Sequence, residues 1–204
     1  MQIETVEVGH YFLPVVLNFQ DVLKKMNDDE FETFCHHNPD LQIELTKEGE
    51  LVIMPPTGGE TGIRNFSLIG LFFNWVEKDK SGVAFDSSTV FKLPNGAKRS
   101  PDLSWVKNEK WNTLSAGEKR KFPPICPDFV VELRSPSDSL TNLKNKMAEY
   151  IENGAAFGWL IDPIKRRVHV YRHTGEAEIL ENPETVSGEP LLKNFTLQMQ
   201  KIWS

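Results

Sequence analysis

The chain has 204 residues, of which 39% are hydrophobic and 25% charged, the composition of a globular domain with a sizeable core. Its formal net charge of −6 argues against a general nucleic-acid coat protein, because such proteins bind phosphates through excess positive charge. Local basic contacts to nucleic acid are still possible. No stretch approaches the ~18 apolar residues of a membrane span. Cys35 and Cys126 form no CxxC pair and indicate free thiols, so we expect a cytoplasmic protein without membrane contact.

No repeat, low-complexity tract or Ser/Gly/Pro-rich linker divides the chain, so a single domain over 1–204 is predicted. Within it we expect a helical N-terminal extension over 1–40, a core over 41–172 and a C-terminal segment over 173–204. Asn18 is a candidate N-cap for a first helix that ends near residue 26.

The next segments alternate between helix and strand signals. A short helix is expected over 28–37, and strands over 41–46 and 51–54 surround a turn at Gly49. A long amphipathic helix should follow the loop at 55–59, with one apolar face buried. The candidates for that buried face are Ile63, Phe66, Ile69, Leu71, Phe73 and Val76.

The second half contains most of the predicted strands. Strands are expected over 83–85, 89–93, 102–106, 128–134, 157–161 and 167–171, a partly helical excursion over 111–121, and a helix that begins at 137–139 and ends near 152. A loop over 182–190 precedes a last strand or short helix. This order predicts an α/β fold with a mixed β-sheet flanked by helices.

Two acidic residues stand where burial would be costly. Asp102 opens one apolar strand, and Glu132 lies inside another. A carboxylate in such a strand costs several kcal/mol to desolvate unless a cation compensates it. Since side chains alternate along a strand, Glu132 and Arg134 share one face, ~6–7 Å apart. The two carboxylates therefore suggest a divalent metal site.

The alternative is a structural ion pair between Glu132 and Arg134, or a sheet edge that faces water. The following helix carries Lys144 and Lys146 on either side of its apolar stripe. Either ammonium group could lean over the carboxylates, and either could instead extend into solvent.

The order Pro101-Asp102, then Glu132-x-Arg134, resembles the PD-(D/E)XK nuclease superfamily, with Arg in place of the usual Lys. The run that begins PDFVVELRSPSDSL at residue 127 and ends at Asp162, with SPDLSWV before it and VHVYR after it, is similar to the Uma-two family, a bacterial branch of that superfamily. The resemblance covers roughly 41–172. It implies a restriction-endonuclease-like mixed sheet flanked by helices.

The resemblance also implies a divalent ion, Mg²⁺ with Mn²⁺ as an alternative, between Asp102 and Glu132. The backbone carbonyl of Leu133 would be a further ligand. The superfamily often adds an acidic residue, for which Glu60 and Glu44 are the two candidates.

Arg134 occupies the catalytic-lysine position of the superfamily, and Lys146 matches the lysine of this branch. Because a guanidinium group cannot give up its proton, Arg134 could bind a phosphate but not act as a base. Lys146 would orient or help deprotonate water. The implied activity is Mg²⁺-dependent hydrolysis of DNA by an endonuclease, and a homodimer is plausible because two strands need two sites. The alternative is a weak or inactive nuclease-fold protein that binds nucleic acid or a protein partner.

Other signals are weaker. The Gly-rich segment 58–62 lacks the Lys-Ser/Thr of a P-loop and is expected to serve helix entry. The basic runs at 119–121 and 165–167 are interpreted as solvated surfaces that could also contact a DNA backbone.

Overall fold

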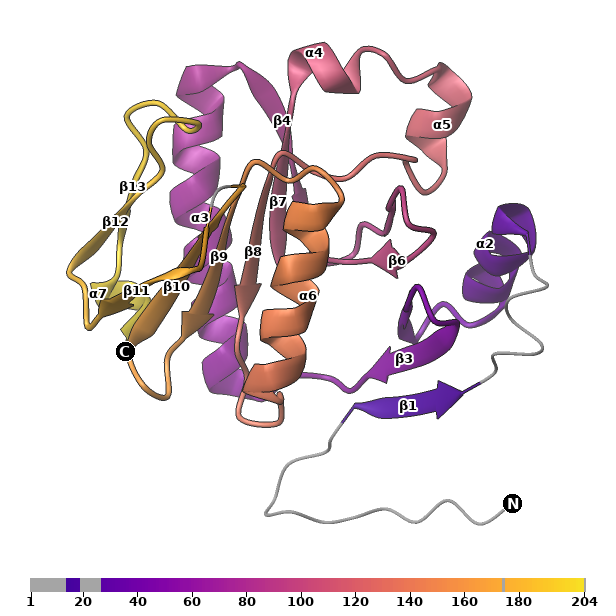
Figure 1. Cartoon of the computed structure of the whole chain (residues 1–204), viewed down its shortest axis with the longest axis horizontal. Helices are drawn as coiled ribbons and strands as arrows, with labels where there is room; N and C mark the ends of the chain where they lie inside the picture. Colours follow the sequence, from indigo (N-terminus) through magenta and orange to yellow (C-terminus); the bar gives the residue numbers. More distant parts are fainter. Residues whose placement is uncertain (1–13, 19–26, 174, 204) are drawn as a thin grey trace.

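The computed structural model describes residues 14–18, 27–173 and 175–203, and Figure 1 shows their arrangement. The helices are α2 (Asp28–His37), α3 (Gly59–Asp79), α4 (Asn108–Trp111), α5 (Ala116–Arg120), α6 (Leu140–Glu152) and α7 (Gln200–Trp203). The strands are β1 (Val15–Asn18), β2 (Gln42–Leu45), β3 (Glu50–Met54), β4 (Gly82–Asp86), β5 (Phe91–Lys92), β6 (Lys98–Arg99), β7 (Leu103–Lys107), β8 (Phe129–Leu133), β9 (Phe157–Asp162), β10 (Arg167–Arg172), β11 (Glu178–Glu181), β12 (Thr185–Ser187) and β13 (Thr196–Gln198).

The central element is a six-stranded sheet in the order β11-β10-β9-β8-β7-β4. Its strands β8 and β9 run parallel and are connected through α6, whereas the other neighbouring pairs are antiparallel. A five-stranded sheet, β1-β3-β2-β6-β5, lies beside it, and β12 and β13 form a separate pair. The predicted α/β fold with a mixed sheet flanked by helices is confirmed.

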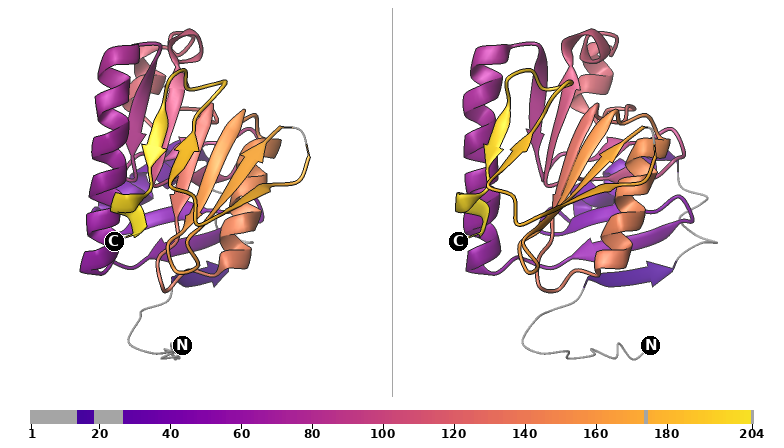
Figure 2. Two further views of the ribbon diagram at one scale, coloured as in Figure 1. Left: turned by 90° about the vertical axis from the view of Figure 1, so that its left-hand side faces the viewer. Right: turned by 60° about the vertical axis from the view of Figure 1, so that its left-hand side comes forward.

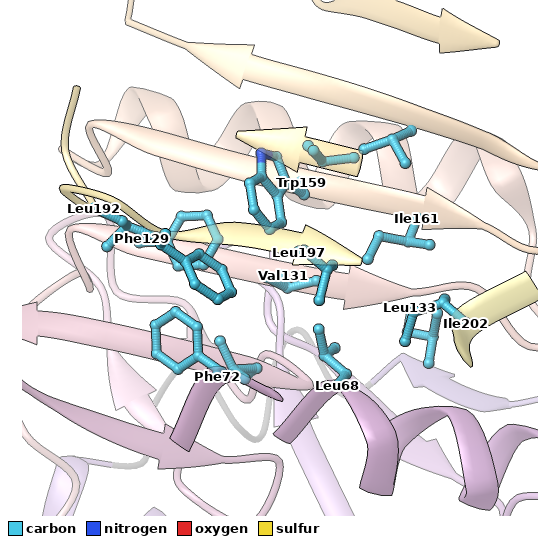
Figure 3. Close-up of a cluster of buried hydrophobic side chains, with 14 of the residues drawn as sticks. Leu68, Phe72, Phe129, Val131, Leu133, Trp159, Ile161, Leu192, Leu197 and Ile202 are labelled. Atoms are coloured by element: carbon cyan, nitrogen blue, oxygen red, sulfur yellow. The ribbon is translucent and has the colours of Figure 1, made fainter. Parts of the chain in front are cut away.

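Helices cover the two faces of the six-stranded sheet (Figure 1). On one face, Leu68 and Phe72 of α3 pack against Phe129, Val131 and other apolar side chains that Figure 3 shows. On the opposite face, α6 packs against the alternate residues of β8, represented by Val130. The alternation of β8 therefore assigns each of its residues to one helix or the other.

The packing of α6 is unusually close at one point. A Cβ atom added at Gly158 on β9 would lie 2.5 Å from Met147 Cε and 3.0 Å from Val130 Cγ2. The glycine therefore allows α6 to approach the sheet. Ser139 caps the start of α6 by accepting a hydrogen bond from the Asn142 backbone N–H, as expected for an N-cap serine.

The predicted buried face of α3 was wrong for four of its six residues, Ile63, Phe66, Ile69 and Phe73, which are exposed. Ile63, Phe66 and Phe73 are 64%, 80% and 58% exposed, respectively, whereas Leu68 and Phe72 are buried. Leu71 and Val76, also predicted to be buried, are partly buried against the core. Apolar residues occur on both sides of this helix, so helical spacing alone could not decide which side the sheet covers.

Some short strands of the structure were not predicted. Asn18 is the last residue of β1, which pairs antiparallel with β3, and the helix predicted to follow it as far as residue 26 lies outside the described residues. The strands β6 and β12 were not predicted, because each is only two or three residues long. Among the described residues, no helix combines the length and apolar character needed to cross a membrane.

Candidate active site

A cleft of about 440 Å³ lies at the end of the six-stranded sheet, between the end of β8, the first turns of α6 and the start of α3. It brings together five of the residues that the sequence singled out. These are Asp102, Glu132, Leu133, Lys146 and Glu60. The start of α3 contributes Gly58 and Gly59, in agreement with the helix-entry role predicted for this segment.

Asp102 directly precedes β7 and lies beside Glu132 of the adjacent strand β8. Leu103 on β7 lies opposite Val131 on β8, so the antiparallel register places Asp102 beside Glu132. The Leu133 backbone N–H donates a hydrogen bond of 2.7 Å to Asp102 Oδ2. Glu132 is buried, whereas Asp102 keeps part of its surface open to the cleft.

Lys146 reaches this pair from α6. Its Nζ lies 2.9 Å from Glu132 Oε1 and 2.8 Å from Glu44 Oε1. One helical turn later, the Tyr150 hydroxyl lies 3.1 Å from Glu132 Oε1 and donates a hydrogen bond to it. Of the two lysines that flank the apolar stripe, Lys146 is the one directed at the carboxylates, and Lys144 is exposed.

Arg99 extends the cluster toward the five-stranded sheet. Its Nη1 lies 3.2 Å from Glu44 Oε2, and its Nε lies 2.6 Å from Glu149 Oε2. The Ser100 backbone N–H also donates to Glu44 Oε1 at 2.7 Å. Arg99 thus connects Glu44 on β2 with Glu149 on α6, and fixes Glu44 where it can hold Lys146.

The sequence analysis missed three members of this cluster: Arg99, Glu149 and Tyr150. Weak signals for them exist. Arg99 stands three residues before Asp102, and Glu149 and Tyr150 follow Lys146 by one helical turn, the spacing at which side chains share a helix face.

The cluster carries more negative than positive charge. Its carboxylates are those of Glu44, Asp102, Glu132 and Glu149, and its cations are Lys146 and Arg99. Four carboxylates against two cations leave two negative charges uncompensated when all groups are ionised. A doubly charged cation would balance them.

The pKa shifts locate the uncompensated charge. Burial raises the pKa of Asp102 to about 6, and burial also raises the pKa of Glu132 despite the attraction of Lys146. Burial by itself would also raise the pKa of Glu44, but the nearby charges of Lys146 and Arg99 hold that pKa below its usual value. Glu44 is therefore the compensated anion of the cluster. Glu132 shares Lys146 with Glu44, which does not offset its burial, and Asp102 accepts a hydrogen bond from the Leu133 backbone N–H without a cation of its own.

The oxygen donors of the cleft fit a hard divalent cation. Mg²⁺ prefers carboxylate, carbonyl and water oxygens, and Asp102, Glu132 and the Leu133 backbone are oxygen donors that line the cleft. Within the described ranges, no three His, Cys, Asp or Glu side chains form a ready-made cation site. Water would thus have to supply the remaining ligands, as is usual for Mg²⁺.

The two further acidic candidates differ in position. Glu44 is buried in the ion-pair cluster and lines a neighbouring cavity of about 540 Å³. Glu60 stands in the first turn of α3, with its side chain 85% exposed and 3.4 Å from Arg64 Nη2. Both lie near the cleft, but only Glu44 contacts Lys146 directly.

Arg134 is directed away from the carboxylate pair. Its Nη1 lies 2.9 Å from Oδ2 of Asp162, a fully buried residue at the end of β9. Its Nε donates to the Asp138 backbone carbonyl at 3.4 Å. The structure therefore brings Lys146, and not Arg134, to Glu132, and Arg134 neutralises a second buried carboxylate.

The two basic runs form contacts typical of protein surfaces. Lys119 lies over the Trp111 ring, and Lys121 pairs with Asp29. In the second run, Arg167 pairs with Glu181. Such exposed pairs contribute little to stability and leave the basic side chains accessible to a polyanion.

Comparisons with known proteins identify the family and agree with the fold. The model of the Uma2 (Uma-two) family, described as "Putative restriction endonuclease", matches residues 28–200. The chain is also similar to a crystal structure titled as a putative nuclease belonging to DUF820 from Anabaena variabilis ATCC 29413, with a TM-score of 0.67 and 22% identity over 79% of this chain and 89% of that chain. That likeness establishes a shared fold. No curated protein matches. Since the family model spans most of the sequence, the chain belongs to the Uma2 family.

Proposed function

We propose that this protein is a metal-dependent endonuclease that hydrolyses DNA phosphodiester bonds in the cleft between β8, α3 and α6. The observation that carries the proposal is the Asp102–Glu132 pair, two adjacent carboxylates at an open cleft whose surroundings leave two negative charges uncompensated. Membership of a family described as restriction endonucleases supports it. Mg²⁺ is the expected ion, and Mn²⁺ could replace it.

The metal would be held by Asp102, Glu132 and the Leu133 backbone carbonyl. A bound divalent ion polarises a phosphate and lowers the pKa of its water, which makes hydroxide available near neutral pH. The neighbouring anions Glu132 and Glu44 raise the pKa of Lys146 despite its burial, so its ammonium group stays charged. We therefore expect Lys146 to orient water and stabilise the developing phosphoryl charge, and not to act as a base.

The role of Arg134 is a separate part of the proposal. A phosphate contact remains one possibility for a guanidinium group next to the cleft. The ion pair with buried Asp162 favours a second role, in which Arg134 supports the segment between β8 and α6.

Cleavage of plasmid DNA by the purified protein tests the proposal. Mg²⁺ or Mn²⁺ should produce nicked or linear DNA, and EDTA should prevent it. Asp102→Asn and Glu132→Gln should abolish cleavage. Glu181→Gln provides the matched control, because Glu181 is an exposed carboxylate paired with Arg167 away from the cleft. Unchanged cleavage by the Asp102 and Glu132 variants would show that the site is elsewhere.

A second candidate function is nucleic-acid or protein binding without cleavage. One observation favours it: Lys146 already forms ion pairs with both Glu132 and Glu44, and Arg134 is engaged by Asp162. Calorimetric titration with Mg²⁺ and Mn²⁺ separates the two functions. Metal binding that Glu132→Gln abolishes supports the nuclease, whereas DNA binding without metal binding supports the alternative.

The cellular setting is also a proposal. Cys35 and Cys126 are unpaired, and burial raises the pKa of the Cys126 thiol to about 12, which makes it unreactive. Two reduced cysteines are consistent with the predicted cytoplasmic location. DNA, the proposed substrate, would be accessible there.

A further inference from the structure

The outer side of α3 carries an apolar surface that the described residues leave in contact with solvent. Figure 2 shows α3 along the margin of the molecule, with the sheets to one side of it. We call this surface the α3 face. Its exposed apolar residues are Ile63 (64% exposed), Phe66 (80%), Ile69 (37%) and Phe73 (58%).

The α3 face is large enough to contribute to a protein–protein interface. A whole aromatic side chain presents ~150–250 Å², so the four side chains leave on the order of 450 Å² of apolar surface in water. Patches of about 300–600 Å² on single chains are often functional. Two such faces together approach the ~1,000 Å² expected of a specific interface, before any flanking polar residue is counted.

The spacing of the α3 face is self-complementary. Ile63, Phe66, Gly70 and Phe73 follow one another at steps of three, four and three residues, which places them on one stripe. A Cβ atom added at Gly70 would meet no atom within 4 Å, so the fold does not require glycine there. Its effect is to leave a hollow in the centre of the stripe.

An antiparallel pair of α3 helices related by a two-fold axis uses this hollow. When Ile63 lies opposite Phe73 of the second copy, the same register places Phe66 opposite Gly70 of the second copy. The Phe66 ring of each copy then packs into the hollow at Gly70 of the other copy. A parallel pair would instead oppose Phe66 to Phe66 and leave both hollows empty.

The charges around the α3 face fit the same arrangement. The helix and its C-cap carry three acidic and three basic residues: Glu60, Glu77 and Asp79, and Arg64, Lys78 and Lys80. This balance does not suit an anionic membrane or DNA, which select basic surfaces. Antiparallel helices have favourably opposed dipoles, and Glu77 would lie near the positive first turn of the second copy.

We propose that the α3 face is a two-fold interface that binds a second copy of this chain, with the two α3 helices antiparallel. The proposal does not depend on the nuclease assignment. It has a geometric consequence, however. Because the start of α3 lines the cleft, the two clefts would lie at opposite ends of the helix pair.

Sedimentation equilibrium of the full chain over the micromolar range tests the interface. The wild-type protein should be a dimer, and Ile63→Ser and Phe66→Ser should convert it to a monomer. Ile164→Ser is the matched control, since Ile164 is a 50% exposed isoleucine away from α3, and it should remain a dimer. Gly70→Glu is a second disrupting variant, chosen because the added side chain has open space in the single chain.

Circular dichroism establishes that each variant is folded. If one serine variant does not fold, Gly70→Glu still decides the question. A monomeric wild-type protein overturns the proposal, and so does a dimer that survives Phe66→Ser and Gly70→Glu. A dimer that is lost in these variants and retained in Ile164→Ser supports it.

Discussion

On the α3 side of the six-stranded sheet, β8 presents Phe129, Val131 and Leu133 to an apolar layer (Figure 3), whereas on the α6 side it presents Val130 and then Glu132. The first face buries only apolar side chains from this strand. The second ends in a cluster of carboxylates, and burial raises the pKa values of two of them, Asp102 and Glu132.

The two faces of β8 have opposite effects on the free energy of folding: the apolar face stabilises the fold, and the face with the carboxylates opposes it. Apolar burial on the α3 side contributes roughly 1.5–3 kcal/mol for each large side chain. Burying Asp102 and Glu132 on the other side opposes folding, and the raised pKa values express that cost. Such a site is typical of proteins that trade stability for function. Substitutions on the two faces should therefore have different consequences.

The largest expected effect concerns activity on the α6 side. Glu132→Gln should reduce metal-dependent cleavage by roughly a hundredfold or more, since it removes one of the charged ligands proposed for the metal. Initial rates of plasmid nicking at saturating Mn²⁺ measure this loss. A residual rate near that of the wild-type protein would place the chemistry outside the cleft.

The largest expected effect on stability concerns the α3 side. Ile161→Ala should lower the free energy of unfolding by about 2–5 kcal/mol, because Ile161 is fully buried in the apolar layer. Ile164→Ala, three residues away and 50% exposed, should change it by less than about 0.5 kcal/mol. Urea unfolding compares the two. Equal effects would contradict the described burial.

An intermediate effect is expected for the second buried ion pair. Arg134→Gln should destabilise the protein by about 2–3 kcal/mol, because it leaves the buried Asp162 carboxylate without its cation. Adding Asp162→Asn should recover most of this loss. If cleavage recovers together with stability in the double variant, Arg134 supports the fold. If cleavage stays low while stability returns, Arg134 contacts the phosphate.

The smallest expected effect is a pH-dependent gain in stability. The folded pKa of Asp102 is about 6, above the usual 3.8, so its contribution to folding is present below the unfolded pKa and is lost as pH rises through about 6. The Asp102→Asn variant has no ionisable group at this position, so its stability does not fall in this way as the pH rises. In EDTA, the variant should be more stable than the wild-type protein by about 1–2 kcal/mol near pH 8, and equal to it near pH 4.

Mg²⁺ should make the wild-type protein more stable than the Asp102→Asn variant, the reverse of their order in EDTA. An ion that binds only the folded wild-type protein stabilises it by mass action, whereas Asp102→Asn should gain little. Thermal unfolding with and without Mg²⁺ near neutral pH makes the comparison. A wild-type protein that Mg²⁺ does not stabilise would favour the reading of a nuclease fold without a metal.

Much of the secondary structure was predictable because its signals are local. The helix over 28–37 has the predicted bounds, and its capping box joins Asn27 and Glu30, which are only three residues apart in sequence. The strands β8 and β9 were equally clear, because their predominantly apolar runs are typical of buried strands. A strand of two residues, such as β6, is too short to show an apolar run or an alternation.

The site was predictable in part. Asp102, Glu132 and Lys146 stood out by residue type and by resemblance, and the structure places them in one cluster. The pairing of Arg134 with Asp162 and that of Lys146 with Glu44 were not predicted. Asp162 and Glu44 lie far from these partners in sequence, and no local rule relates such positions.

The sequence by itself determined most of the helices and the longer strands, and that one carboxylate precedes and another interrupts an apolar strand, because propensity, caps and alternation act over a few residues. Only the tertiary structure decided which side of α3 is buried, that Lys146 bridges Glu44 and Glu132, and that Arg134 pairs with Asp162. These outcomes depend on which surfaces of distant segments meet. Burial and charge compensation are properties of the packed molecule and not of any short stretch of chain.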